Sequence, residues 1–324
     1  MIFVGVDGGT SHMESVVIDA SGAVLGRGRG GPSNHPLGSG MHPRVGDHLV
    51  SAIGEALAAA RLTASDVTAV SLNLSGRREE LTIARARAWL APLGLTPTCQ
   101  IEVGEDHLSA WAAAGFPDPA IWVLLGTHWG SGGIVDGRVV DHPLDCAGLD
   151  QDNAALAEGA VIGSLAISAA LRSQLGGPPT RLYAALCTSL GVEGIEGLIR
   201  WARAHTGSDQ RASLCALAAQ VAQEGDAVAR ELFRRAGEGL GAATVTMGRY
   251  LGVATRPATI VLAGQVWQAG EILLEPFRRT VLAGLPQAVV HLNRLTQAHG
   301  AALLALRLAG IMPGDDVFAR LAAS

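Results

Sequence analysis

The order of the predicted strands and helices constrains this chain more than any single motif does. In residues 1–117, apolar alternation and helical periodicity predict the order β-β-β-α-β-α-β-α. Residues 118–311 repeat this order, with an all-helical insertion at about 153–251. Such a repeat predicts an α/β fold in which two similar domains face each other across a cleft. A last helix, at about 312–324, could pack back onto the first domain.

Each copy of the repeat begins with an apolar strand that ends in a Gly-Thr turn. The turns are Asp7-Gly8-Gly9-Thr10 and Gly126-Thr127. Because any α/β protein alternates strands and helices, this coincidence is what favours a duplicated domain. In the first copy we expect strands 2–6, 15–19, 23–28, 67–74 and 100–103, and helices 47–61, 79–90 and 107–114. In the second copy we expect strands 120–125, 133–135, 138–140, 259–262 and 288–291, and helices 269–283 and 300–309.

All 24 basic residues are arginines, and this excludes several kinds of site. The chain has no lysine for a Walker-A loop, for a kinase strand or for a Schiff base. Any nucleotide chemistry must therefore rest on backbone N–H groups, metal ions, carboxylates or arginine.

Charge and apolar patterning exclude other classes of partner. The formal net charge is −5 and no basic run occurs, which argues against nucleic acid or an anionic membrane as a binding partner. The start of the chain lacks the pattern of a signal peptide, and no apolar stretch approaches the roughly 18 residues of a membrane helix. Four scattered cysteines are typical of reduced thiols, so we expect a cytoplasmic protein.

The glycine-rich turns are candidate phosphate sites. Backbone N–H groups at Gly8 and Gly9 could form an anion-binding nest, with Thr10 as a further donor. Asp7 could orient Mg²⁺ through water. A plain hairpin turn is the alternative for this segment and equally for Gly126-Thr127.

Two further segments could contact substrates. Asp106, at the start of a helix, could accept a proton from a substrate hydroxyl. When this residue is considered alone, a helix cap or a first-turn acid is the favoured interpretation. Gly264-Gln265 follows a strand and would allow a flat ligand such as adenine to approach; a tight strand-to-helix connection is the alternative. The histidines form no zinc-binding pattern and are interpreted as surface or loop residues.

Six segments in order resemble the N-acetylglucosamine kinase and BadF/BadG/BcrA/BcrD ATPase family of the actin/hexokinase/Hsp70 (ASKHA) superfamily. They are Gly5-Val6-Asp7-Gly8-Gly9-Thr10, Gly31-Pro32-Ser33-Asn34-His35, Leu72-Asn73-Leu74-Ser75-Gly76, the segment 223–238, Ala263-Gly264-Gln265-Val266-Trp267 and Gly300-Ala301-Ala302. The resemblance implies two ribonuclease H-like (actin-like ATPase) domains and ATP-dependent phosphorylation of a sugar or amino sugar hydroxyl.

The resemblance also implies a role for each matching residue. Asp106 corresponds to the catalytic base and Asp7 to the acid that organises Mg²⁺ through water. ATP and Mg²⁺ are the implied cofactors and a small sugar is the implied partner. Formation of a homodimer is an open alternative. The implied phosphate contacts are Gly8, Gly9, Thr10, Gly126 and Thr127, the adenosine contacts are Gly264 and Gln265, and the substrate contacts are Asn34, Ser75, Gly76 and Asp106.

The sequence departs from the family in its substrate segment. The usual G-G-W-G…G-D-E-G-S pattern is absent from residues 146–158, where Leu149 replaces the tryptophan. His128 and Trp129 also interrupt the second phosphate motif. Four acids could supply replacement hydroxyl contacts or could be solvated loop acids, which is the slightly favoured interpretation: Asp145, Asp150, Asp152 and Glu158.

Three other functions compete with a sugar kinase. A non-catalytic or weakly active ATP- and sugar-binding protein would result if the altered segment no longer supports turnover. A dehydratase-activating ATPase would need paired cysteines for an iron–sulfur cluster, and the cysteines are isolated. A repressor of the related type would need a DNA-binding domain before the first motif, and only Met1–Val4 precede it.

Overall fold

The computed structural model describes residues 1–34, 40–75, 81–141 and 154–324. The chain forms two compact units. Unit 1 consists of Met1–Pro117 together with Leu292–Ser324, and unit 2 consists of Asp118–His291. Each unit is built on its own five-stranded sheet.

The unit 1 sheet has the order β3-β2-β1-β4-β5. Strand β1 pairs antiparallel with β2 and parallel with β4, and β4 pairs parallel with β5. The carboxyl ends of β1, β4 and β5 therefore lie at one edge of the sheet. The strands are β1 (Ile2–Gly8), β2 (Met13–Asp19), β3 (Val24–Gly30), β4 (Val67–Leu74) and β5 (Gln100–Gly104).

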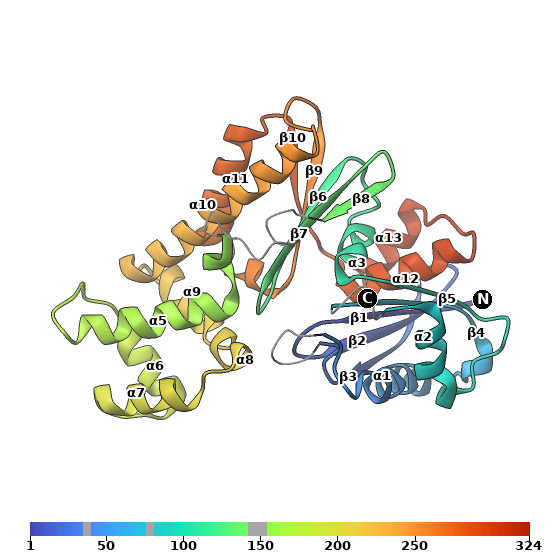
Figure 1. Cartoon of the computed structure of the whole chain (residues 1–324), viewed down its shortest axis with the longest axis horizontal. Helices are drawn as coiled ribbons and strands as arrows, with labels where there is room; N and C mark the ends of the chain where they lie inside the picture. Colours follow the sequence, from blue (N-terminus) through green and yellow to red (C-terminus); the bar gives the residue numbers. More distant parts are fainter. Residues whose placement is uncertain (35–39, 76–80, 142–153) are drawn as a thin grey trace. The chain divides into compact units, whose positions relative to one another are not determined.

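Helices cover both faces of this sheet (Figure 1). Helix α1 packs on one face with α2 beside it, and α12 packs on the other face with α3. The helices are α1 (Val45–Ala60), α2 (Ile83–Leu90), α3 (Asp106–Ala113), α12 (Gln297–Leu308) and α13 (Asp315–Ala322), and the short 3-10 helices are η1 (Ala64–Asp66) and η3 (Ala91–Leu93).

Alternating glycines on β3 allow α1 to lie directly on the sheet. A Cβ atom at Gly26 would lie 2.1 Å from the carbonyl oxygen of Ala56, and one at Gly28 would lie 2.1 Å from that of Ala52. Because successive strand residues point to opposite faces, the intervening Arg27 faces away from α1. The G-R-G-R-G pattern is thus a packing surface for a helix.

The structure corrects one expected boundary, because α12 belongs to unit 1 rather than to the segment 118–311 assigned to the second domain. The helix buries small residues against β1, and a Cβ at Gly5 would lie 2.0 Å from the backbone nitrogen of Ala302. Phe3 and Leu303 belong to the same buried cluster. Close backbone packing of this kind depends on tertiary contacts that a strand and helix pattern does not encode.

A buried histidine anchors the start of α12. His299 Nε2 lies 2.9 Å from an Arg27 guanidinium nitrogen. The Nδ1 atom lies 3.0 Å from Thr296 Oγ1 and 3.2 Å from the Thr296 backbone nitrogen, whose N–H donates to it in a capping box. Burial and then the Arg27 charge lower the pKa of His299 to about 4, against a smaller raising effect of Glu14.

This histidine should make the protein less stable in mild acid. The unfolded chain binds the proton near pH 6.5 and the folded protein at about 4, so the free energy of unfolding should fall as the pH drops between these values, by up to about 3 kcal/mol. His299→Gln should remove this part of the pH dependence in urea unfolding at pH 7.0, 5.5 and 4.5. A parallel loss of stability in both proteins would contradict the assignment.

The unit 2 sheet has the order β10-β9-β6-β7-β8, which repeats the unit 1 order when it is read from β8. Strand β6 pairs antiparallel with β7 and parallel with β9. The α/β class is confirmed, and the strands of the second unit follow the predicted order along the chain. The strands are β6 (Ala120–Leu125), β7 (Trp129–Val135), β8 (Arg138–Asp141), β9 (Ala258–Ala263) and β10 (Ala288–Leu292).

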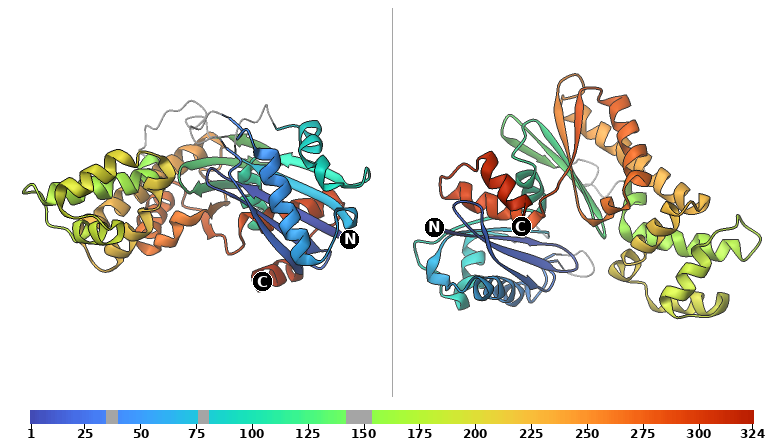
Figure 2. Two further views of the ribbon diagram at one scale, coloured as in Figure 1. Left: turned by 90° about the horizontal axis from the view of Figure 1, so that it is seen from below. Right: turned by 180° about the vertical axis from the view of Figure 1, so that it is seen from behind.

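Helices of unit 2 occur mainly between β8 and β9 in the chain. The 24-residue helix α10 lies beside α11 (Figure 2). Asp226 caps α10 by accepting from the Ala229 N–H and also accepts from the Arg181 N–H. The helices are η4 (Ala154–Ala157), α5 (Gly159–Ser173), α6 (Leu182–Leu190), α7 (Gly194–Ala204), α8 (Ser208–Ala212), α9 (Cys215–Gln223), α10 (Ala227–Tyr250), η5 (Gln265–Ala269) and α11 (Glu271–Gly284).

Within the described ranges, no single helix is long and apolar enough to span a membrane, and α6 and α7 reach that length only as a pair bent by 65°.

The histidines differ from expectation, because His107 and His299 are buried rather than at the surface. Both belong to helices that pack inside unit 1.

Candidate functional site

The two acids singled out in the sequence come together at the carboxyl edge of the unit 1 sheet. Asp7 lies next to the end of β1, and its register partner on β4 is Asn73, which is in turn the partner of Gly104 on β5. Asp106 follows β5 as the first residue of α3, and Glu105 is the N-cap. Asp106 therefore does not cap the helix, although it remains a first-turn acid that favours the helix dipole.

Two polar side chains connect the Asp7 carboxylate to the backbone of Asp106. Ser109 Oγ lies 2.9 Å from Asp7 Oδ1 and 2.5 Å from the carbonyl oxygen of Asp106. Gln297 Nε2 lies 3.3 Å from each of the same two oxygens. Ser109 is one helical turn after Asp106, whereas Gln297 comes from the start of α12. Asp7 is thus tied to the backbone at the beginning of α3.

The electrostatic surroundings of Asp7 suit a cation. Burial raises the pKa of Asp7 well above its usual value, and the charge of Asp106 raises it further, while the Ser109 hydrogen bond lowers it. Glu14, the cross-strand partner of Asp7, also raises this pKa. Hard carboxylate oxygens are what Mg²⁺ prefers, and a cation would offset both burial and the neighbouring negative charge. The residues present therefore fit Mg²⁺.

The first glycine turn is joined to two other predicted segments by a buried serine. Ser33 Oγ lies 3.2 Å from the carbonyl oxygens of Gly9 and Ser75 and 3.3 Å from Ser75 Oγ. The backbone adds hydrogen bonds from Ser33 N to Gly9 O and from Ser75 N to Gly8 O. Gly8 is packed tightly, since its Cβ would lie 2.6 Å from Leu74, whereas the nearest atom to a Gly9 Cβ is His12 O at 3.8 Å.

The predicted sugar contacts fall partly within the described residues. Asn34 forms an isolated bridge with Met41, and its buried Oδ1 accepts no hydrogen bond from residues that the structure describes. Thr10 lies in the loop between β1 and β2 and is half-buried. Gly76 lies outside the described residues, as do Asp145, Asp150 and Asp152.

The second Gly-Thr turn lies at the carboxyl end of β6 in unit 2. Gly126 O accepts from the N–H of Gly159 over 2.9 Å, and Thr127 O accepts from the N–H of Ala160. The first turn of α5 therefore packs onto this turn. A Gly126 Cβ would meet no atom closer than 3.9 Å, so neither φ nor packing requires glycine at this position.

The predicted adenosine segment lies beside the same turn. Gly264 has a φ of 104°, and its Cβ would lie 2.4 Å from Leu125 O, so the fold itself requires glycine there. Gln265 begins η5 and is exposed. Because β6 and β9 are parallel, Gly126-Thr127 and Gly264-Gln265 share one edge of the unit 2 sheet.

Two carboxylates contact the second turn, and only one of them was considered in the sequence analysis. Glu158 Oε2 lies 3.2 Å from His128 Nδ1, and Glu158 Oε1 accepts from the Trp129 N–H. Thr127 Oγ1 donates to Asp209 over 3.2 Å. The hydrogen bond to Glu158 raises the pKa of His128. Interpreting Glu158 as a solvated loop acid was therefore wrong, because its carboxylate contacts His128 and Trp129, which directly follow the turn.

Sequence reasoning missed three side chains that link the predicted residues. Ser33 lies inside a segment that was recognised, and Ser109 lies three residues after Asp106 on a helix, so each had a detectable signal. Gln297 had none, because only the tertiary structure brings the start of α12 to β1.

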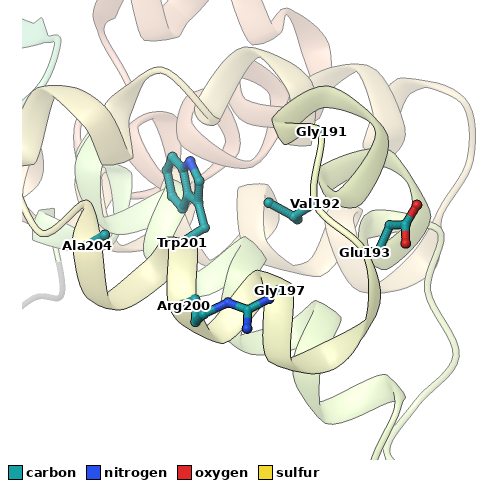
Figure 3. Close-up of a pocket in the computed structure, with 7 residues that line it drawn as sticks. All are labelled: Gly191, Val192, Glu193, Gly197, Arg200, Trp201 and Ala204. Carbon is teal, nitrogen blue, oxygen red and sulfur yellow. The ribbon is translucent and has the colours of Figure 1, made fainter.

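A surface hollow of about 360 Å³ lies elsewhere, between α7 and the loop that precedes it (Figure 3). Trp201, Arg200 and Glu193 are among its lining residues. It contains none of the predicted site residues and is not part of the candidate site.

Comparisons with solved structures identify the fold. A proposed N-acetylglucosamine kinase from Chromobacterium violaceum is 23% identical, with a TM-score of 0.67, over 94% of this chain and 98% of that chain. One from Porphyromonas gingivalis is 20% identical, with a TM-score of 0.65, over 94% and 98%. A ROK-family glucokinase from Streptomyces griseus, solved with glucose and AMPPNP, is 20% identical, with a TM-score of 0.62, over 95% and 100%.

No protein-family model and no curated protein sequence matches the chain. This chain shares the fold of these solved structures over nearly its whole length.

Proposed function

We propose that the protein is an ATP-dependent kinase that phosphorylates a hydroxyl group of a sugar or amino sugar. The observation that carries the proposal is the placement of Asp7 and Asp106 together beside the Gly8-Gly9 turn. Ser109 and Gln297 connect the Asp7 carboxylate to the backbone of Asp106 at one sheet edge. The fold, shared with sugar kinases over nearly the whole chain, supports the same reaction class.

In this reaction Asp106 accepts the proton of the substrate hydroxyl, whose oxygen forms a bond to the terminal phosphorus of ATP while the bond to ADP breaks. Asp7 would hold Mg²⁺ through water, and the bound ion would supply charge neutralisation for the phosphates. The N–H groups of Gly9 and Gly126 donate to His12 O and His128 O over 3.0 Å, and they must leave these partners before they can bind phosphate. Once released, they and the neighbouring Gly8, Thr10 and Thr127 bind phosphate oxygens, and Gly264-Gln265 contacts adenosine. Glycine at positions 9 and 126, where the fold does not require it, supports a close backbone approach by these oxygens.

The substrate side of the site consists of Asn34, Ser75 and Gly76. The buried Asn34 Oδ1 is an acceptor suited to a sugar hydroxyl, because a buried polar atom without a partner is costly. Ser33 joins this loop to the phosphate turn, so substrate and nucleotide contacts are connected within unit 1.

The test is sugar-stimulated ADP release by the purified full chain with Mg²⁺-ATP. N-acetylglucosamine, glucose, glucosamine and other hexoses form the panel, and ATP binding is measured in parallel by calorimetry. We expect at least one sugar to stimulate ADP release clearly above the rate without sugar. If ATP binds but no sugar has this effect, the kinase proposal fails and the non-catalytic binding protein is supported instead.

A further inference from the structure

Ser109 and Gln297 each contact the Asp7 carboxylate and the backbone carbonyl oxygen of Asp106, but neither is needed to begin the helix on which it lies. Thr296 caps α12 by accepting from the His299 N–H, so the Gln297 amide is not required as a cap. The Ser109 hydroxyl can donate its hydrogen bond to the carbonyl oxygen of Asp106 within its own helix. The contacts with Asp7 are therefore additional to helix formation.

Ser109 and Gln297 differ in the number of protons that they can donate. A serine hydroxyl has one proton, so Ser109 donates either to Asp7 or to the Asp106 carbonyl at a given moment. The Gln297 amide has two protons and can donate to both oxygens at once. Together they can maintain at least one connection between β1 and the start of α3.

We propose that Ser109 and Gln297 are positioning residues, which orient the Asp7 carboxylate toward the nucleotide's magnesium ion and keep Asp106 at a set place relative to it. This inference rests on the proposed function and deepens it. Outer partners that orient a metal-binding carboxylate typically change metal affinity by about 10- to 100-fold when they are removed. Their effect should therefore appear in magnesium-dependent nucleotide binding rather than in binding of ATP alone.

Calorimetry on the full chain tests this without any sugar. ATP affinity is measured with Mg²⁺ and with EDTA, and the ratio of the two affinities is the readout. We expect Ser109→Ala and Gln297→Leu each to reduce the ratio by about tenfold, with the affinity in EDTA unchanged within about twofold. An equal loss under both conditions, or a wild-type affinity that does not depend on Mg²⁺, would overturn the proposal.

Matched controls exclude a general packing effect. Gln223→Leu removes an amide that donates to Ala269 O over 2.9 Å, and Thr244→Val removes a buried hydroxyl that donates to Leu240 O. Both lie in unit 2, away from Asp7 in the chain and outside the candidate site. They should leave the magnesium-dependent ratio unchanged.

A double-mutant cycle with Asp7→Asn separates action through Asp7 from local disruption. If Ser109 and Gln297 act through the Asp7 carboxylate, their replacement in the Asp7→Asn protein should cause no further loss of the ratio. The same tenfold loss in that background would contradict the proposal. Because this readout needs no turnover, a protein without sugar-stimulated ADP release would refute the kinase function while leaving the positioning role separately measured.

Discussion

Replacing Asp106 with asparagine should lower the kcat of sugar-stimulated ADP release by about 10³-fold while leaving ATP affinity unchanged within about twofold. The amide keeps the size of the side chain but cannot accept the substrate proton. Turnover is measured by coupled ADP release and affinity by calorimetry on the same preparation. Retained activity would refute Asp106 as the base.

Glu102→Gln is the matched control for this substitution. Glu102 lies on β5, the strand that leads to Asp106, and accepts a hydrogen bond from Ser71 Oγ over 2.8 Å. Burial raises the pKa of Glu102, so a neutral amide suits the position. We expect kcat to stay within a few-fold of wild type. A large loss would mean that activity follows the integrity of β5 rather than the chemistry of Asp106.

Gly300→Ala should be among the most destabilising single-methyl changes in unit 1, whereas Gly54→Ala should be neutral or stabilising. Both glycines lie inside helices. A Cβ at Gly300 would lie 1.8 Å from Ser109 O and 2.9 Å from the backbone nitrogen of Ala113, so α12 and α3 would have to separate. The nearest atom to a Gly54 Cβ is Leu93 Cδ2 at 4.0 Å.

Urea unfolding at pH 7 measures the difference. We expect Gly300→Ala to lower the free energy of unfolding by about 3 kcal/mol through overpacking. Gly54→Ala should raise it by up to about 1 kcal/mol, because alanine is the better helix former. Similar effects of the two substitutions would show that α12 is not packed against α3 as described. Gly300→Ala should also impair activity, since its clash is with the backbone of Ser109.

Much of the local structure was accessible from the sequence because each element carries its own signal. Strands β4 and β6 have the expected bounds, since both are bounded apolar runs. Other elements differ by a few residues at their ends, as for α1, which begins at Val45 rather than residue 47. Helix α2 begins at Ile83 after its Thr82 cap, whereas residues 79–90 were expected, and 76–80 lie outside the described part.

The candidate residues were found through motifs, but their connections were not. Asp7 and Asp106 stand at strand ends and helix starts, where periodicity and turn chemistry mark them. Gln297 is separated from Asp7 by most of the chain, and Ser33 looks like any polar loop residue until its hydroxyl is placed among Gly9 and Ser75. The roles of Glu158 and Asp209 as partners of the second turn likewise depend on packing.

By itself the sequence determined the α/β class, the repeated order of strands and helices along the chain and the lack of any lysine-based phosphate site. These follow from periodicity and residue identity, which act over a few neighbours. Only the tertiary structure decided that α12 joins the first unit and brings Gln297 to Asp7. The physical reason is close backbone packing. The absence of a Cβ at Gly5 allows α12 to pack on β1, and its absence at Gly300 allows α12 to pack on α3. These two glycines are far apart in the sequence, so no local pattern indicates that both contribute to the packing of one helix.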